Sequence, residues 1–348
     1  MINSISKTII SSNGKTLFYK LEHFIEDIII GNSCFICGAK PESKQFNNEH
    51  IIPEWILRKY NLFDQRIALP NKTKIPYSKY KVPCCLDCNS ELGETYEKPI
   101  SQLFEKSSNE VIEILNKSNE TKKKVFTWLC LIFFKTHLKD TQLRQNLDFR
   151  QSNNTIGERY NWADFHHLHC VVRSHFTGAK IHSKVIGSMY FNKVIQSENK
   201  FDYIDNSFVQ GVLLQLGDFC ICSILNDSNE SKNIYKLKIS KIIGLPTLFQ
   251  FYEVFANLNY INLYLEQRAQ FQSIFDYNLE YRIIAKRPKK NKILNVIFRK
   301  HSFGKFLRIY IERSSESMEF TKDFLDEIEK GNLSFLWSEN GEFIDPAK

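Results

Sequence analysis

The first part of the chain alternates short apolar segments with polar turns, a pattern that indicates both strands and helices. Within residues 1–30, the dipeptide Asn13-Gly14 separates the segments KTII and KTLFYK and predicts a β-hairpin. A helix is expected directly after Pro53, and Pro99 is expected to break or kink a later one. The predicted strands are residues 44–52 and 79–84, the predicted helices are 54–63, a segment from 89 or 90, and 100–117, and residues 64–74 are predicted to be a loop.

The pattern changes at Val125. The apolar run VFTWLCLIFF, from Val125 to Phe134, is about half as long as the roughly 20 residues that span a membrane, so it predicts a buried helix instead, at 125–147. Later segments are rich in β-branched and aromatic residues between turn-forming ones, which predicts strands. The predicted strands are 166–175, 180–195, 208–226, 233–240 and two within 292–312; a last helix is predicted at 318–330, and 245–285 fits either helix or strand.

Composition adds a preference for anionic partners and a reducing compartment. Lys and Arg outnumber Asp and Glu by 47 to 39 among 348 residues, a net charge of +8 that favours polyanions but also serves solubility. The N-terminus has no basic flank followed by an apolar stretch, so no signal peptide is expected. With nine cysteines and no secretion signal, the chain is expected to be cytoplasmic, without a membrane partner.

Two Cys-x-x-Cys pairs, Cys34/Cys37 and Cys85/Cys88, are the strongest chemical signal in the sequence. Each pair can place two sulfurs on one ion, and four thiolates make a closed, structural zinc site. The competing interpretation is four unrelated cysteines buried as small apolar residues. Cys84 also lies within reach of Cys88, but only Cys85 gives the two-residue spacing, so Cys84 is expected to be a neighbouring strand residue.

Between these pairs stand Glu49 and His50, and Asn89 follows the last cysteine directly. Neighbouring side chains of a strand point to opposite faces, so Glu49 and His50 can share one site only if the strand ends there, before Pro53. The competing interpretation is a surface strand with a solvated Glu and an incidental His. The position of the pair between the two cysteine turns favours a functional role.

The segment 34–97 resembles the HNH (ββα-metal) endonucleases, in the branch where two Cys-x-x-Cys pairs hold a structural zinc. The matching motifs are Glu49-His50-Ile51-Ile52-Pro53 and Cys85-Leu86-Asp87-Cys88-Asn89. The resemblance implies that His50 is the general base acting on water. It also implies that Glu49 and Asn89 hold one Mg²⁺ or Mn²⁺ ion, and that the substrate is DNA, most readily duplex DNA.

The match lacks the middle Asn of the family motif, which orients the catalytic imidazole. The residues before the second cysteine pair contain no Asn, and the nearest, Asn71, is far upstream. Either a backbone carbonyl or Tyr80 orients His50, or the site is impaired. On the helix after Asn89, Glu94 and Glu97 are candidates for an extended metal shell, whereas Glu91 is expected only to complement the helix dipole.

A basic run at 286–308 contains nine Lys or Arg residues and no acidic residue. It fits contacts to DNA phosphates and equally fits a solvated hairpin. The candidates for the DNA backbone are Lys286, Arg287, Lys289, Lys290, Lys292, Arg299 and Lys300. The cluster His166-His167-Leu168-His169 with Cys220 and Cys222 could form a second metal site, but half-buried histidines on a strand explain it better.

The predicted fold class is α+β, with an N-terminal zinc-stapled HNH-like module and a larger mixed domain. The predicted parts are a lead-in at 1–30, the module at 31–117, a linker at 118–124 and the second domain at 125–348, which would bind DNA, sense a signal or contact a protein partner. The predicted function is a metal-dependent DNA endonuclease; enzymes of this type are frequently restriction or anti-phage defence proteins. The alternatives are a catalytically impaired nucleic-acid-binding protein and a structural zinc knuckle on a protein-interaction domain.

Overall fold

The computed structural model describes residues 7–148, 150, 152–195, 198–276, 280–293, 300–314 and 320–347. Contacts within the chain divide it into two compact units, each built of helices and strands, so the α+β class is confirmed. Unit 1 consists of Met1–Lys106, Glu120–Val185 and Gln270–Ala285, and unit 2 of Ser107–Asn119, Ile186–Ala269 and Lys286–Lys348.

Unit 1 begins with the predicted hairpin. Strands β1 (Ile9–Ile10) and β2 (Thr16–Phe18) pair antiparallel, and Gly14 in the turn between them has a φ of 79°. The next segment is helical: α1 (Leu21–His23) continues into a π-helix, Phe24–Ile30.

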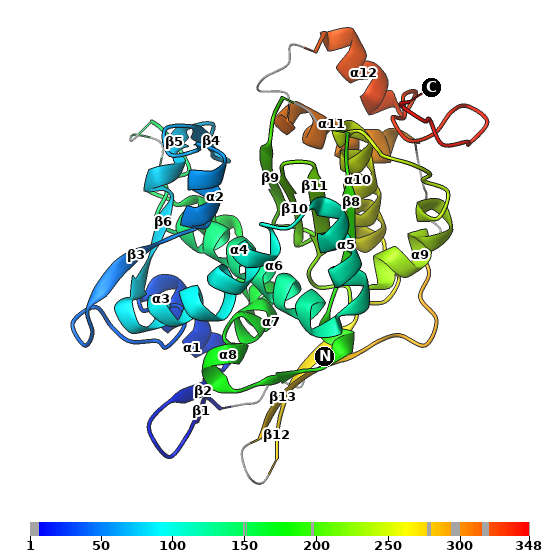
Figure 1. Ribbon diagram of the computed structural model, residues 1–348. Coiled ribbons are helices and arrows are strands. Elements are labelled where there is room, and N and C mark those ends of the chain that lie inside the picture. The colour runs from blue at the N-terminus through cyan, green and yellow to red at the C-terminus, as the bar shows by residue number, and fades with distance from the viewer. Residues whose placement is uncertain are drawn as a thin grey trace. The chain divides into compact units, whose positions relative to one another are not determined.

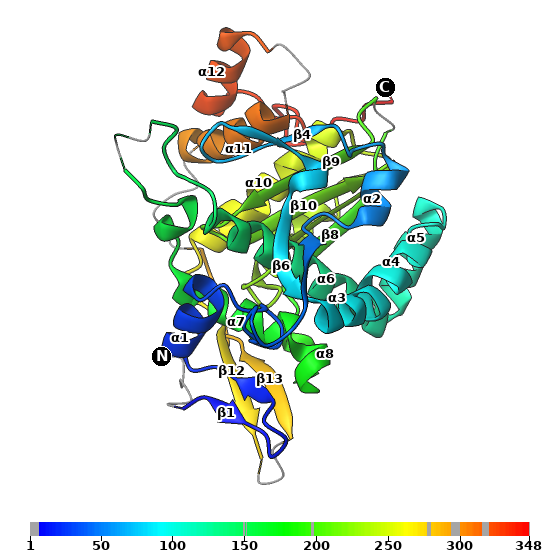
Figure 2. The same ribbon diagram turned by 90° about the vertical axis from the view of Figure 1, so that its left-hand side faces the viewer.

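A strand–strand–helix element carries the predicted chemical residues (Figure 2). Strands β3 (Phe46–His50) and β6 (Lys81–Cys85) pair antiparallel, with Glu49 opposite Val82 and His50 opposite Lys81. Strand β6 leads directly into α3 (Leu86–Leu92), which contacts both strands. The two strands and the helix were predicted, each within a few residues of these bounds.

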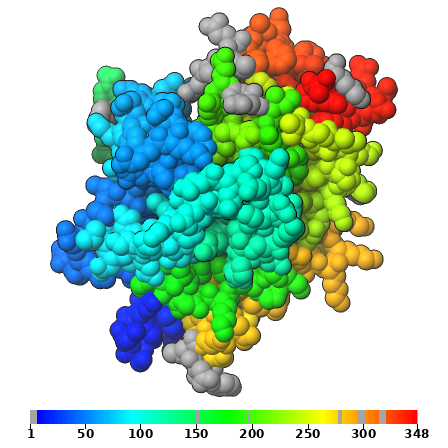
Figure 3. Space-filling view, in the orientation of Figure 1, coloured from blue at the N-terminus to red at the C-terminus, as the bar shows by residue number. Residues whose placement is uncertain are grey.

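The insertion between β3 and β6 forms a surface segment of unit 1 (Figure 3). It contains α2 (Glu54–Lys59), the paired strands β4 (Arg66–Ala68) and β5 (Lys74–Pro76), and a 3₁₀ turn at Tyr77–Lys79. The loop prediction for 64–74 is therefore wrong. These strands are short and lack the alternation of buried and exposed positions that would identify them in the sequence.

Helix α6 (Asn119–Asp140) is the most buried helix of unit 1, and its residues Val125–Leu138 are buried on every side. Residues 119–124 of the predicted linker at 118–124 are instead the first part of this helix, because their Glu and Lys residues are good helix formers. Before it come a π-helix at Gly93–Glu97, α4 (Lys98–Leu103), with Pro99 in its first turn, and α5 (Ser108–Lys117), which belongs to unit 2. In the described part of the chain, no helix is long and apolar enough to cross a membrane.

Unit 1 is completed by α7 (Trp162–Val172), α8 (Ser174–Thr177) and a three-stranded sheet. The strand predicted at 166–175 is wrong, because Trp162, Phe165, His169 and Val172 are buried at the spacing of a helix. The sheet has the order β12-β13-β7, with β12 at Gln270–Phe275, β13 at Tyr281–Lys286 and β7 at Lys180–Ile181.

Unit 2 is built on an antiparallel sheet with α10 (Leu248–Leu263) packed on it (Figure 1). Helix α10 supplies much of the core, with Phe251, Phe255 and Leu258 fully buried. The sheet has the order β8-β11-β10-β9, and its strands are β8 (Ser188–Lys193), β9 (Phe201–Asn206), β10 (Gly211–Leu216) and β11 (Phe219–Ile224).

The C-terminal predictions for unit 2 are partly wrong. The segment predicted as a strand at 233–240 belongs to α9 (Glu230–Ile239). Of the two strands predicted within 292–312, the second is replaced by α11 (Lys300–Ser314), and most of the first lies at 294–299, outside the described residues. The last helix is confirmed as α12 (Lys322–Lys330). Aromatic residues contributed to the wrong prediction at 292–312, since on α11 Phe303 and Phe306 pack against Tyr260 of α10 and not in a sheet.

Candidate metal and catalytic site

The four paired cysteines converge. The Sγ atoms of Cys34, Cys37, Cys85 and Cys88 all lie within 4.8 Å of one another, and those of Cys37 and Cys85 are 3.6 Å apart. Four sulfurs at about 2.3 Å from one tetrahedral zinc ion would lie about 3.8 Å apart, so the cluster could hold such an ion.

Cys84 stands beside this cluster without joining it. It pairs with Asn47 across the β3–β6 ladder, and its Sγ lies 3.8 Å from that of Cys34. The group of four mutually close sulfurs in the described residues leaves it out. This agrees with the interpretation of Cys84 as a neighbouring strand residue.

The histidine cluster on α7 supports the Cys34–Cys37 turn and does not form a second metal site in the described residues. His169 Nε2 lies 2.8 Å from the carbonyl oxygen of Phe35, inside the Cys34–Cys37 turn. His166 Nε2 lies 2.7 Å from the carbonyl of Tyr19, and the His167 ring stacks on Phe271 with centroids 3.7 Å apart. Cys220 and Cys222 are buried on β11 in the core of unit 2.

Glu49 is buried and bound to a lysine that the sequence analysis did not single out. Lys135 of α6, with 0% of its surface exposed, donates from Nζ to Glu49 Oε1 at 2.6 Å and to the carbonyl oxygen of His50 at 2.6 Å. The only sequence signal was a lone Lys at the end of a ten-residue apolar run, within a helix predicted to be buried. A buried lysine needs an anionic or carbonyl partner, and Lys135 finds both at the end of β3.

Glu97, the last residue of the π-helix Gly93–Glu97, adjoins the Glu49–Lys135 ion pair. Burial raises its pKa to about 7; Lys135 opposes the shift, and a hydrogen bond with Glu49 adds to it. Glu94 behaves differently, because it is exposed and pairs with Lys98 at 3.2 Å. Of the two proposed additions to a metal shell, only Glu97 is therefore beside Glu49.

His50 offers an unpaired nitrogen. Its Nε2 is buried and has no hydrogen-bond partner among the described residues, which is rare for a buried polar atom. Burial, and then the charge of Lys81, lower its pKa from the ordinary value. The imidazole is therefore neutral at pH 7, with a nitrogen able to accept a proton.

Asn89 lies on α3 and donates from Nδ2 to Asn47 Oδ1 at 2.9 Å. Asn47 and Glu49 are two residues apart on β3, so they share the face of the strand that α3 contacts. This brings Asn89 and Glu49 to one side of β3. Apart from the thiols, however, no three His, Cys, Asp or Glu side chains among the described residues are close enough to hold an ion.

Asn71 does not replace the missing middle Asn of the family motif. Its Nδ2 donates to the carbonyl of Arg144 at 2.7 Å, and its Oδ1 accepts from the backbone N–H of Thr73 at 3.0 Å. Tyr80, the other candidate, is buried next to Lys81, the residue paired with His50. Its carbonyl accepts from the N–H of Ile51 at 3.1 Å, so the Tyr80 backbone supports the chain directly after His50.

The basic run divides into exposed and bound residues. Lys286, Lys289, Lys290 and Lys292 are exposed, while Arg287 donates to Ser228 Oγ at 2.9 Å. Arg308 is bound by Glu312, Asp326 and Glu329 at 2.7–2.9 Å. Arg299 and the side chain of Lys300 lie outside the described residues.

No protein-family model, no curated protein and no solved structure matches this chain. The case for any function therefore rests on the residues and on their arrangement in unit 1.

Proposed function

We propose that this chain is a metal-dependent DNA endonuclease of the HNH type. The observation that carries the proposal is the β3–β6–α3 element, which carries Glu49, His50 and Asn89 and supplies Cys85 and Cys88 to the cluster of four thiols. Four thiolates leave no open coordination position, so a zinc ion there would be structural and the reaction would belong to the other three residues.

In this proposal His50 takes the proton of the attacking water. Its lowered pKa and its unpaired Nε2 suit a general base at neutral pH. Glu49 and Asn89, with Glu97 as a further carboxylate, would hold one Mg²⁺ or Mn²⁺ ion. A bound ion of this kind stabilises charge on the phosphate and on the leaving 3′ oxygen.

Lys135 sets a condition on this site. Its ammonium group already neutralises Glu49, so Glu49 would have to bind the metal ion with its second oxygen or exchange one cation for the other. The same ion pair favours a second candidate function, a nucleic-acid-binding protein that has lost the reaction, and so does the missing middle Asn.

Cleavage of supercoiled plasmid DNA in Mg²⁺ or Mn²⁺ tests the proposal. Wild type should nick or cut the plasmid, and His50→Ala should lower the rate by about 10²–10⁴-fold, because the proton acceptor is lost. His182→Ala is the matched control, since His182 is an exposed histidine of unit 1.

Duplex binding, measured in parallel, separates the two candidates. Cleavage by wild type that His50→Ala does not reduce would contradict the role of His50. An inert wild type that still binds duplex DNA would favour the impaired binding protein.

A further inference from the structure

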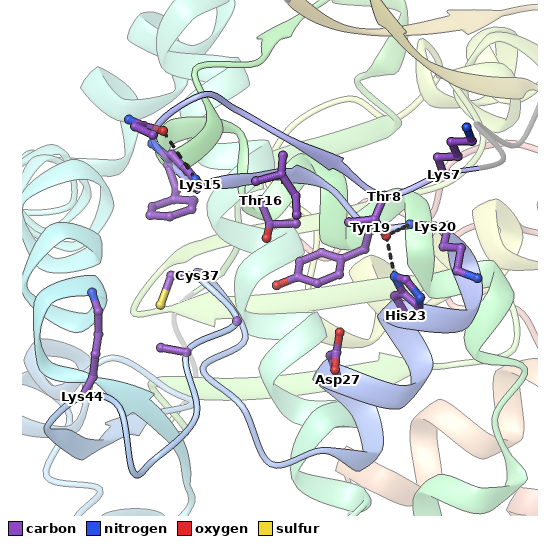
Figure 4. Close-up of a pocket in the computed structure, with 16 residues that line it drawn as sticks. Lys7, Thr8, Lys15, Thr16, Tyr19, Lys20, His23, Asp27, Cys37 and Lys44 are labelled. Carbon is purple, nitrogen blue, oxygen red and sulfur yellow. Dashed lines mark hydrogen bonds between the residues drawn. The ribbon is translucent and has the colours of Figure 1, made fainter.

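A pocket of about 1040 Å³ lies in unit 1, between the Cys34–Cys37 turn and the N-terminal hairpin. The β1–β2 hairpin, the start of α1 and the residues after Cys37 form its walls (Figure 4). The proposed reaction uses none of these residues. The side chains that matter most here are Lys7, Lys15, Lys20, Lys44 and Tyr19.

Positive charge dominates the lining. Four lysines face one carboxylate, Asp27, which has its own partner in Lys40 at 4.0 Å. Lys44 pairs with Asp87 at 2.9 Å, and Lys20 approaches Glu22 at 3.8 Å. Lys7 and Lys15 form no ion pair with the part of the chain that the structure describes, although Lys15 Nζ lies 4.0 Å from the centre of the Phe176 ring.

The buried guanidinium group of Arg173 adds positive charge next to Tyr19, which lines the pocket. Arg173 is 2% exposed and lies 4.8 Å from the centre of the Tyr19 ring. It donates to the carbonyl oxygens of Ile36 and Thr16, and no carboxylate of the described residues lies within ion-pair distance. A bound Zn²⁺ ion with its four thiolates would carry two net negative charges, and Arg173 would offset part of them. The lysines of the lining would then set the sign of the pocket.

The floor of the pocket is rigid. Gly38 has a φ of 78°, and a Cβ atom added there would overlap the hydroxyl oxygen of Tyr19. Tyr19 therefore packs directly on the Cys34–Cys37 turn. His169 of α7 and Arg173, directly after α7, bind backbone carbonyls of the same turn. A ligand on this floor would meet a fixed surface surrounded by mobile lysine side chains.

We propose that this pocket binds the phosphodiester backbone of a nucleic acid. In Figure 4, Tyr19 lies between Lys15 and Lys44 on one side and Lys7 and Lys20 on the other, so the charges are spread apart. Separate ammonium groups on flexible stems suit successive phosphates of a strand, whereas a single phosphate is usually held by an arginine fork or a cradle of N–H groups. The choice of a nucleic acid as the polyanion rests on the proposed function. The positive charge of the pocket is independent of that function, because it follows from the lining lysines.

The test measures binding of a fluorescent 20-base-pair duplex to full-length protein by anisotropy at several salt concentrations. All proteins carry His50→Ala, so that cleavage does not interfere. The double variant Lys7→Gln/Lys15→Gln should weaken binding. It should also lower the slope of log affinity against log salt by about two, because each phosphate contact contributes about 0.9.

The matched control is Lys236→Gln/Lys241→Gln, which removes the same charge from exposed positions of unit 2. Its slope should stay within about 0.5 of the parent value. Equal slopes for the pocket variant and the control would overturn the proposal, and so would weaker binding by the pocket variant with an unchanged slope.

Plasmid cleavage by the same variants with His50 restored separates this proposal from the nuclease. Cleavage by wild type, together with a pocket variant that binds like the control, refutes the pocket and leaves the nuclease standing. An inert wild type whose pocket variant still loses salt-dependent binding refutes the nuclease and supports the pocket.

Discussion

At the scale of single residues, the buried pair Glu49–Lys135 and the half-buried Glu97 decide most of what the site can do. The Lys135 ammonium binds the Glu49 carboxylate and the backbone carbonyl of His50 at the end of β3, and the Glu97 carboxyl interacts with both Lys135 and Glu49. Lys135 is the partner without which Glu49 would be a buried, unpaired charge.

Replacing Lys135 tests this dependence. Lys135→Met should lower the free energy of unfolding by about 3–5 kcal/mol, because it leaves Glu49 buried without a counter-ion. Chemical denaturation measures the change. Lys124→Met, at an exposed position of the same helix, should change stability by less than about 0.5 kcal/mol. A Glu49→Gln/Lys135→Met protein should recover part of the loss, and a double variant less stable than Lys135→Met would contradict the pairing.

Glu97 predicts a pH dependence of stability. Its pKa is raised to about 7 in the folded protein, from 4.5 when exposed, so its contribution is complete below about pH 4.5 and is lost as the pH rises through 7. Glu97→Gln should therefore gain in melting temperature relative to wild type between pH 5 and 8, measured with zinc present and no other divalent ion. Glu94→Gln, at an exposed position, should differ from wild type by a small change in melting temperature that does not vary with pH. The same pH trend in both variants would argue against a raised pKa of Glu97.

His50 predicts the acidic limit of the proposed reaction. Because burial and Lys81 lower its pKa, protonation should abolish cleavage only below the ordinary value of about 6.5. In a pH profile of kcat/KM, the acidic break should therefore lie below 6.5. A break above that value would mean that another group, such as Glu97, limits the rate.

At the scale of elements, the junction of β6 and α3 joins the cluster of four thiols to the candidate catalytic residues. Cys85 ends β6, Cys88 lies in the first turn of α3, and Asn89 is the next residue of that helix. A zinc ion on these thiols would fix the helix against β3, and with it the distance from Asn89 to Glu49.

Elemental analysis of purified protein tests the assignment of the ligands. Cys88→Ser should reduce zinc from one ion per chain to near zero and destabilise unit 1. Cys84→Ser should keep one zinc ion, because Cys84 stands outside the cluster. Loss of zinc from Cys84→Ser with retention in Cys88→Ser would reverse the assignment.

At the scale of the whole molecule, acidic side chains neutralise only some of the positive charges in the basic run at 286–308, which the sequence does not indicate. Part of the basic run is neutralised, as at Arg308, while Lys289 and Lys290 are exposed. Lys289→Gln/Lys290→Gln should therefore reduce the salt slope of DNA binding by about two, if this run contacts the backbone. Arg308→Gln should leave the slope unchanged and lower stability instead, and the reverse pattern would assign the phosphates to Arg308.

The comparison of sequence and structure separates local from long-range information. Turn chemistry and alternation predicted the hairpin at Asn13-Gly14, β3, β6 and α3 from a few neighbouring residues each. The strand predictions at 166–175 and 233–240 were wrong because aromatic and β-branched residues suit any buried surface, including that of a helix.

By itself, the sequence determined the mixed fold class and the zinc-binding potential, since each depends on residue type and short spacing. The residues of the candidate reaction came from a family resemblance and stay a prediction. The tertiary structure decided which of these residues have partners. Lys135 lies 86 positions from Glu49, and Arg173 lies 137 positions from the turn that it holds, so no local pattern could connect them. Burial, which only a folded chain creates, turns these distant pairs into the interactions that set the charge and the pKa values of the site.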